Sequence, residues 1–173
     1  MERRGGKRLG IHRRAALRPR IKSMPEKKTI ERARQDKREG KAASTQAGEF
    51  VREEVDLIRK GAHGARSAKQ AIAIGLSKAR RAGVKLPLPK KGAVAKETRR
   101  KAERDLEKAG EIGVNPVSRK RSRATLNALK REGRAAASKK ALSQQARAAA
   151  RKRTPAERSA AAKKAAQTRK AKE

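Results

Sequence analysis

Large apolar side chains recur at helical spacing in only one part of the chain, residues 44–86. The first half of this segment predicts a helix that has Ser44 or Thr45 as its N-cap and runs to Lys60, just before Gly61. Its apolar stripe follows the i, i+4, i+7 rule and consists of Phe50, Val51, Val55, Leu57 and Ile58.

A second helix is predicted from Ser67 to about Ala82, where Gly83 ends it. Ser67 and Gln70 form a capping box, which satisfies the first backbone donors of a helix. The apolar positions of this helix are Ile72, Leu76 and Ala79, and the small residues Ala68 and Gly75 permit close packing. Because only residues 61–66 join the two helices, they are predicted to pair as an antiparallel hairpin. Val84 and Leu86 are expected to fold back over its end.

The remaining helical signals are dominated by charge. Helices are predicted over 94–109 and 119–132, and a last one begins at Pro155 after the capping residue Thr154. The predicted fold class is therefore mostly α: a small helical hairpin at 44–86, flanked by basic arms that are disordered or conditionally helical. Residues 1–43 are expected to be a disordered basic arm, 87–133 to hold charged helical segments and linkers, and 134–173 to be an Ala/Lys/Arg-rich tail.

Composition argues against a large core. The 173 residues include 52 Lys and Arg against 17 Asp and Glu, a net charge of +35, and 1% are aromatic. Such chains bury too little apolar surface to offset their conformational entropy. The hairpin is accordingly expected to need a partner, a polyanion or self-association, and the residues expected to mediate self-association are Val51, Val55, Ile58, Ile72 and Leu76.

Several classes of chemistry lack the residues they need. The chain has no cysteine, and its two histidines, His12 and His63, are too far apart for a convincing metal site. No nucleotide-binding loop or hydrolase motif is present, so we expect a non-enzymatic protein without a cofactor or a small-molecule substrate. No apolar stretch is long enough to cross a membrane. Residues 1–23 are interpreted as an extension upstream of a natural start at Met24, with a mitochondrial transit peptide as the alternative.

The density of cations points instead to the phosphates of nucleic acid. With a single aromatic residue, stacking on unpaired bases is not expected, so duplex DNA is favoured and no sequence preference is predicted. The tail is expected to become helical when phosphates quench its self-repulsion. The candidate phosphate-binding residues are Lys60, Arg66, Lys69, Arg80, Arg81, Lys90, Lys91, Arg119, Lys120, Arg121, Arg123, Lys139, Lys140, Arg151, Lys152, Arg153, Lys163 and Lys164.

A local motif offers another route to a phosphate. Gly61 and Gly64 form a GxxG loop between the two predicted helices, the arrangement with which KH modules clamp a nucleic-acid backbone. No strand is predicted nearby, so a simple glycine connection with His63 exposed in it is the favoured interpretation.

The segment from Arg66 to Ser77, with the sequence RSAKQAIAIGLS, carries a resemblance to known proteins. Together with its flanks from Gly48 to Pro87, it resembles a domain of unknown function found in short basic proteobacterial proteins. The Lys/Ala/Arg-rich tail is similar in composition to histone H1-like tails. The resemblance implies a bacterial cytoplasmic setting, here the nucleoid, and supplies no catalytic residues.

Three functions remain as hypotheses, with binding to an anionic membrane surface as a weaker fourth option. The first is a nucleoid-type protein that binds duplex DNA without sequence preference. The second is a binder of structured RNA, for example one associated with the ribosome, because duplex RNA offers the same phosphate charge. The third is a module whose hairpin docks a protein partner, with the basic arms providing only localisation.

Overall fold

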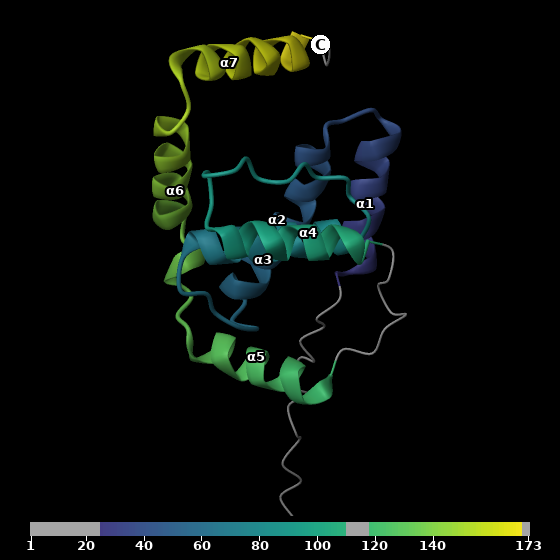
Figure 1. Cartoon of the computed structure of the whole chain (residues 1–173), viewed down its shortest axis with the longest axis vertical. Coiled ribbons are helices and arrows are strands. Elements are labelled where there is room, and N and C mark those ends of the chain that lie inside the picture. Colours follow the sequence, from purple (N-terminus) through teal and green to yellow (C-terminus); the bar gives the residue numbers. More distant parts are fainter. Residues whose placement is uncertain (1–24, 110–117, 171–173) are drawn as a thin grey trace, which may run out of the picture.

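The structure is a computed structural model that describes residues 25–109 and 118–170 (Figure 1). Within these ranges all regular structure is helical, which confirms the predicted mostly α class. The elements, in chain order, are α1 (Lys27–Arg38), α2 (Ala43–Arg59), α3 (Ala68–Arg81), α4 (Lys96–Glu107), α5 (Arg119–Arg131), the 3-10 helix η1 (Ala135–Ala137), α6 (Lys139–Arg151) and α7 (Pro155–Lys170).

Helices α2 and α3 form the predicted hairpin, and they pack through small residues. The face of α3 that meets α2 is formed by Ala68, Ala71, Gly75 and Ala79, all buried. At Gly75 the helices approach so closely that an added Cβ would lie 2.6 Å from the Cα of Val51. The larger Ile72 and Leu76, predicted to form the core stripe, are only partly buried. Close backbone approach has therefore replaced interdigitating large side chains.

Two of the five residues in the predicted self-association stripe are internal. Val55 and Ile58 are 6% and 0% exposed, and they pack within the chain against Ala65 and Ala71. A buried side chain offers no surface to a second copy, so this part of the expectation is wrong.

Residues 27–38 were expected to belong to a disordered arm, and that expectation is wrong, because they form α1. Ile30 and Ala33 of α1 pack against Ala47 and Phe50 of α2 in the first hydrophobic cluster. The buried Glu53 of α2 accepts a hydrogen bond from the backbone N–H at the N-cap of α1, at 3.1 Å, where a negative charge also favours the helix dipole. Residues 1–24, which make up most of the rest of the expected arm, lie outside the described residues.

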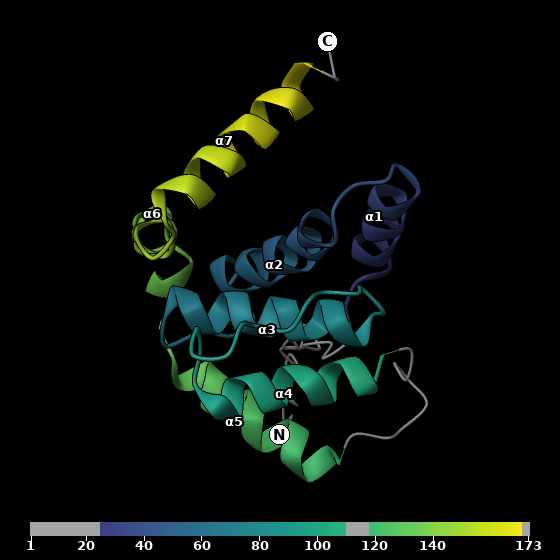
Figure 2. The ribbon, with the colours of Figure 1, turned by 45° about the horizontal axis from the view of Figure 1, so that its top comes forward.

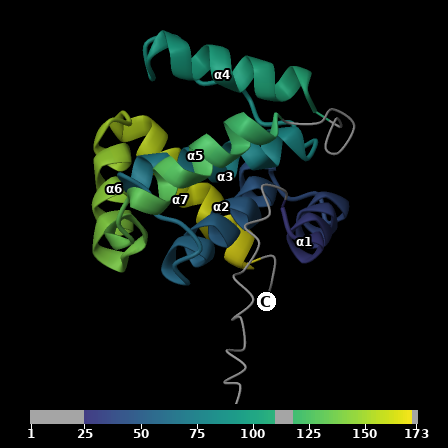
Figure 3. The ribbon, with the colours of Figure 1, turned by 90° about the horizontal axis from the view of Figure 1, so that it is seen from below.

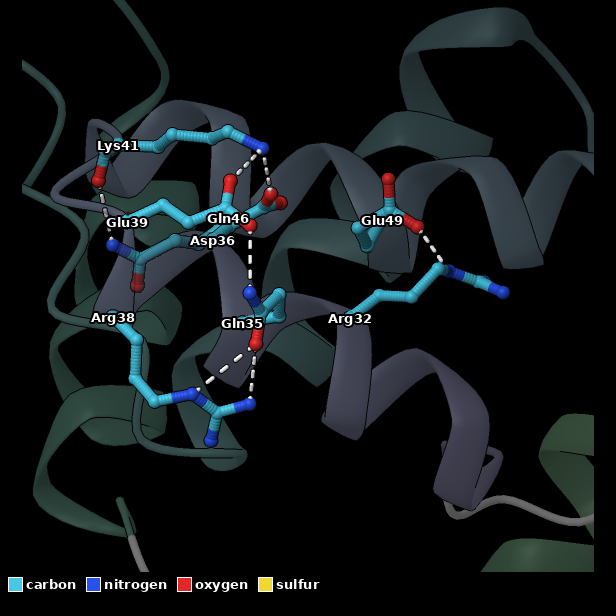
Figure 4. Close-up of polar contacts among 8 residues, drawn as sticks. All are labelled: Arg32, Gln35, Asp36, Arg38, Glu39, Lys41, Gln46 and Glu49. Carbon is cyan, nitrogen blue, oxygen red and sulfur yellow. Dashed lines mark hydrogen bonds and ion pairs between the residues drawn. The ribbon is translucent and has the colours of Figure 1, made fainter.

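Polar side chains close the turn between α1 and α2 (Figure 4). The Lys41 ammonium lies 2.7 Å from a carboxylate oxygen of Asp36 and 2.7 Å from one of Glu39. Hydrogen bonds to these carboxylates, chiefly that of Asp36, raise the pKa of Lys41 above its usual value. Arg32 of α1 also pairs with Glu49 of α2. These cations are engaged in holding α1 on α2.

The chain after α3 completes the first cluster as predicted. Val84 and Leu86, 7% and 8% exposed, fold back onto Phe50 and Ala79. Gly83, at φ +89°, supplies the left-handed residue that this reversal requires.

A second hydrophobic cluster joins distant parts of the sequence. Ala136 and Ala137 of η1, with Leu142 of α6 beside them, pack on the end of the hairpin. The guanidinium of Arg59 donates to the carbonyl oxygen of Ala137 at 2.9 Å. The backbone N–H of Gly64 donates to the carbonyl oxygen of Leu129, also at 2.9 Å. The end of α5, η1 and the start of α6 are therefore part of the folded body, which the interpretation of residues 134–173 as a tail did not anticipate.

Glu54 lies at the centre of this body and is 0% exposed. One carboxylate oxygen is 2.7 Å from Lys78 Nζ on α3, and the other is 3.3 Å from His63 Nε2 in the connection. Burying a charge is costly unless it is paired. Glu54 therefore ties α2, α3 and their connection into one arrangement.

The substitution Lys78→Met should lower the free energy of unfolding by about 3 kcal/mol, because it leaves the Glu54 carboxylate buried without its closest cation. The double variant Glu54→Leu/Lys78→Met should recover most of that loss. Urea unfolding followed by circular dichroism at 222 nm measures both. Lys101→Met is the control, since its pair with Glu97 is exposed and should contribute less than about 1 kcal/mol. Equal effects at positions 78 and 101 would contradict this account.

Two glycine-to-alanine substitutions in helices should act in opposite directions. Gly75→Ala should destabilise the protein, because the new Cβ meets the backbone of Val51 at 2.6 Å. Gly48→Ala in α2 has nothing within 4 Å and should stabilise by up to about 1 kcal/mol through helix propensity. Thermal unfolding distinguishes them, and stabilisation by Gly75→Ala would refute the close crossing.

Candidate nucleic-acid interface

Several acidic side chains serve contacts between elements of the fold. Besides Glu53 and Glu54, Asp105 of α4 accepts from the Ser77 hydroxyl of α3 at 2.6 Å and pairs with Arg81. Glu132 lies 3.5 Å from Arg66 Nε. Glu97 and Lys101, by contrast, pair along one exposed helix at 2.9 Å. The acidic side chains in these contacts are withdrawn from neutralising the cations at the surface.

Two of the predicted phosphate-binding residues are taken up by the fold. Arg80 is 8% exposed, and burial lowers the pKa of its guanidinium below the usual value, although nearby Asp105 opposes this. Arg81 is half-buried, donating to the Ser77 hydroxyl at 3.0 Å and pairing with Asp105 at 3.4 Å. The prediction that Arg80 contacts phosphate is wrong, because helical spacing turns this side chain inward. Arg81 acts mainly as a link between α3 and α4.

The other candidates whose side chains are described lie on the surface. Lys90 is paired at 3.8 Å with Glu157 yet remains 89% exposed, and Arg66 is 82% exposed beside Glu132. The side chain of Arg119 lies outside what the structure describes. The remaining exposed candidates are Lys60, Lys69, Lys91, Lys120, Arg121, Arg123, Lys139, Lys140, Arg151, Lys152, Arg153, Lys163 and Lys164.

Six exposed cations are brought to one end of the hairpin, and we call them the hairpin-end patch: Lys60, Arg66, Lys69, Arg134, Lys139 and Lys140. The first three flank the connection between α2 and α3. The others follow α5, in the segment that packs on this connection through Ala136 and Ala137. Sequence reasoning missed Arg134, whose guanidinium lies over Gly61, because no local pattern links position 134 to position 61.

The glycine loop of this patch is not a phosphate clamp. The Cα of Gly64 faces the backbone of the 132–133 segment, where an added Cβ would be 1.9 Å from the carbonyl oxygen of Glu132. His63, expected to be exposed, is 6% exposed and faces Glu54. The described residues also contain no strand, which a KH fold requires. The interpretation as a glycine connection is thus the better one, and the role of this connection is to seat the chain that follows α5.

Positive charge is distributed unequally along the chain. Residues 25–91 contain 18 Lys and Arg against 8 Asp and Glu, whereas residues 118–170 contain 18 against 2. The second region forms α5, α6 and α7: α6 lies at the side of the α1–α3 body (Figures 1 and 3), and α5 and α7 lie at opposite ends of it in the view of Figure 1. The largest excess of cations therefore lies on the helices least involved in the core.

The body formed by α1, α2, α3 and the fold-back at Val84 lies within a segment that is similar to a known domain family. Residues 23–91 match the model of a family of unknown function, DUF6496. This confirms the resemblance to a short domain family of unknown function. No curated protein and no solved structure matches the chain. The second hydrophobic cluster of the DUF6496 segment is completed by Ala136 and Ala137, which lie beyond the matched residues.

The described ranges offer neither a membrane-spanning helix nor a metal site. No helix there is both long and apolar enough to cross a membrane. No group of three or more His, Asp and Glu side chains among those residues is placed to hold a metal ion.

Gly64→Ala should detach the chain after α5 from the DUF6496 segment, because its Cβ cannot fit against the carbonyl of Glu132. The N–H of Ala65, which donates to the carbonyl oxygen of Gly133 at 3.1 Å, should then exchange with solvent at least about tenfold faster. Gly133→Ala is the matched control, since nothing lies within 4 Å of its added Cβ. Unchanged exchange at Ala65 in Gly64→Ala would contradict the docking.

Proposed function

We propose that this protein binds nucleic acid through its phosphates, without reading sequence and without enzymatic activity, and that duplex DNA is its principal target. The observation that carries the proposal is the separation of charge. Several acidic side chains of the α1–α4 region are drawn into contacts between elements, and the described cations of residues 118–170 face outward with only Glu132 and Glu157 among them. Such a surface releases condensed counterions when it meets a polyphosphate, which drives association.

The lack of exposed aromatic rings favours duplex over single-stranded targets. Phe50 is the only aromatic residue of the chain, and it is 1% exposed. Proteins that hold unpaired bases stack them on aromatic side chains. Without such a ring, the contacts left to this protein are those with phosphates, which a duplex presents at the highest density.

The hypothesis of docking through the hairpin stripe keeps only Val51, Ile72 and Leu76 as partly exposed residues. Val55 and Ile58 are covered by the chain itself. Among the described residues, the large apolar side chain that stands out as exposed is Val94, at 37%. Burial of apolar surface usually anchors a protein interface, so partner docking through the hairpin is the weaker proposal. The setting that suits phosphate binding without sequence readout is a bacterial nucleoid, which we include in the proposal.

The affinity for random-sequence duplex DNA should fall steeply with salt. If roughly 6–10 phosphates are engaged, a plot of log affinity against log salt concentration should have a slope of about −5 to −9. Fluorescence anisotropy of a labelled duplex measures it, with competition by duplex RNA as a test of the RNA alternative. A slope near zero would exclude electrostatic binding, and preference for the RNA would favour the second hypothesis.

A matched pair of variants localises the contact. Lys139→Gln/Lys140→Gln, in the hairpin-end patch, should make that slope shallower by about 2. Lys96→Gln/Lys108→Gln removes the same charge from the region of α4. Because Glu97, Glu103 and Asp105 already offset the cations of that helix, this variant should leave the slope nearly unchanged.

A further inference from the structure

Helix α7 projects from the rest of the molecule. Figures 1 and 2 show it leaving the body beyond α6, and all of its described side chains are exposed. Its first turn is fixed by the predicted capping box, in which Thr154 and Glu157 exchange hydrogen bonds of 3.0 and 3.2 Å. Helices in proteins usually gain most of their stability by packing an apolar face. Since α7 packs no such face, its surface is available to a partner along its length.

The cations of α7 point to more than one side. At about 100° of rotation per residue, Arg158 and Arg169 share one line along the helix, and Lys163 and Lys170 share a second. Lys164 marks a third, and the lines are roughly 120° apart. By contrast, α6 carries its cations on one side and turns Leu142 toward the second hydrophobic cluster. Helix α6 suits a single phosphate row, whereas α7 suits surroundings with phosphates on more than one side.

Helix α7 is also slender. Its apolar side chains are all methyl groups, except the ring of Pro155, and they belong to Ala156, Ala160, Ala161, Ala162, Ala165 and Ala166. A helix with such short side chains has a diameter of about 10 Å. The major groove of B-form DNA is about 12 Å wide and has a phosphate row on each wall, whereas the minor groove is about 6 Å wide. The major groove of A-form RNA is too deep and narrow to be entered in this way.

We propose that α7 inserts into the major groove of B-form duplex DNA, with its cations reaching the phosphates of both walls. This inference rests on the proposed function and adds the site and the form of duplex. An anionic membrane fits less well, because no side of α7 carries large apolar residues. An acidic protein surface would meet only one of the lines of charge.

The test uses the full chain and two duplexes with identical phosphates. In one, cytosine is replaced by glucosylated 5-hydroxymethylcytosine, whose sugar fills the major groove. Affinity for the filled duplex should be roughly tenfold lower near physiological salt, and the salt slope shallower by about 3 as the cations of α7 withdraw. The same slope difference is expected between duplex DNA and duplex RNA.

A helix-breaking variant assigns the effect to α7. Ala161→Pro keeps every charge but removes a helical hydrogen bond and breaks the helix, and it should abolish the discrimination against the filled duplex. Ala161→Ser is the matched control and should retain it. Because α7 lies outside both hydrophobic clusters, the unfolding temperature of the body should be unchanged in both variants.

The possible outcomes separate this inference from the proposed function. Equal affinity for filled and unfilled DNA, with a steep salt slope, would overturn groove insertion and leave phosphate binding intact. Discrimination that persists in Ala161→Pro would overturn the assignment to α7, and so would equal binding to duplex RNA with an undiminished slope. A slope near zero on every duplex would overturn the proposed function itself.

Discussion

The buried carboxylate of Glu54 is the constraint on which the folded body depends. It lies without solvent access between Lys78 of α3 and His63 of the connection, so an arrangement that separated these elements would leave a charge unpaired in the interior. Such a charge costs more than any single apolar contact in this body contributes. Its position also explains why the connection is seated inward, which presents the backbone of Gly64 to the chain after α5. One ion pair thus sets both the hairpin and the site where the C-terminal segment docks.

Small side chains determine the rest of the architecture. The chain has too few large apolar residues to fill a core, and it compensates by bringing backbones together at Gly75 and by covering the hairpin with alanines from η1. The hairpin was expected to need a partner to cover it, but the chain itself supplies this cover. Helix α1 covers one hydrophobic cluster, and the segment around Ala136 covers the other. Acidic residues also hold elements together, because Glu53 and Asp105 form hydrogen bonds between helices where an ordinary core would have leucines.

Local signals allowed much of the fold to be predicted. The capping residues Ser67 and Thr154 and the glycine after α3 marked helix ends correctly, because a cap depends on neighbours within a few positions. The packing of helix α1 through Ala33 and the docking of Ala136 were not predictable in this way. An alanine shows no amphipathic signal, and its burial depends on residues far along the chain. Exposed cation clusters could likewise be predicted from charge density alone. The loss of Arg80 to the interior and the gain of Arg134 at the patch could not, because both follow from tertiary contacts.

The separation of paired carboxylates in the body from excess cations at the surface follows from the small number of acidic residues. A body that must pair its few carboxylates internally cannot also use them to neutralise its surface, so a compact core and a strongly positive exterior arise together. Self-repulsion would oppose that core if the excess cations were spread evenly over it. The excess cations are instead concentrated on residues 118–170, and α7 carries some of them farthest from the α1–α3 body. This placement moves the repulsion away from that body. The outermost helix then bears the charge that a polyanion relieves, and binding at α7 need not disturb the packing around Glu54.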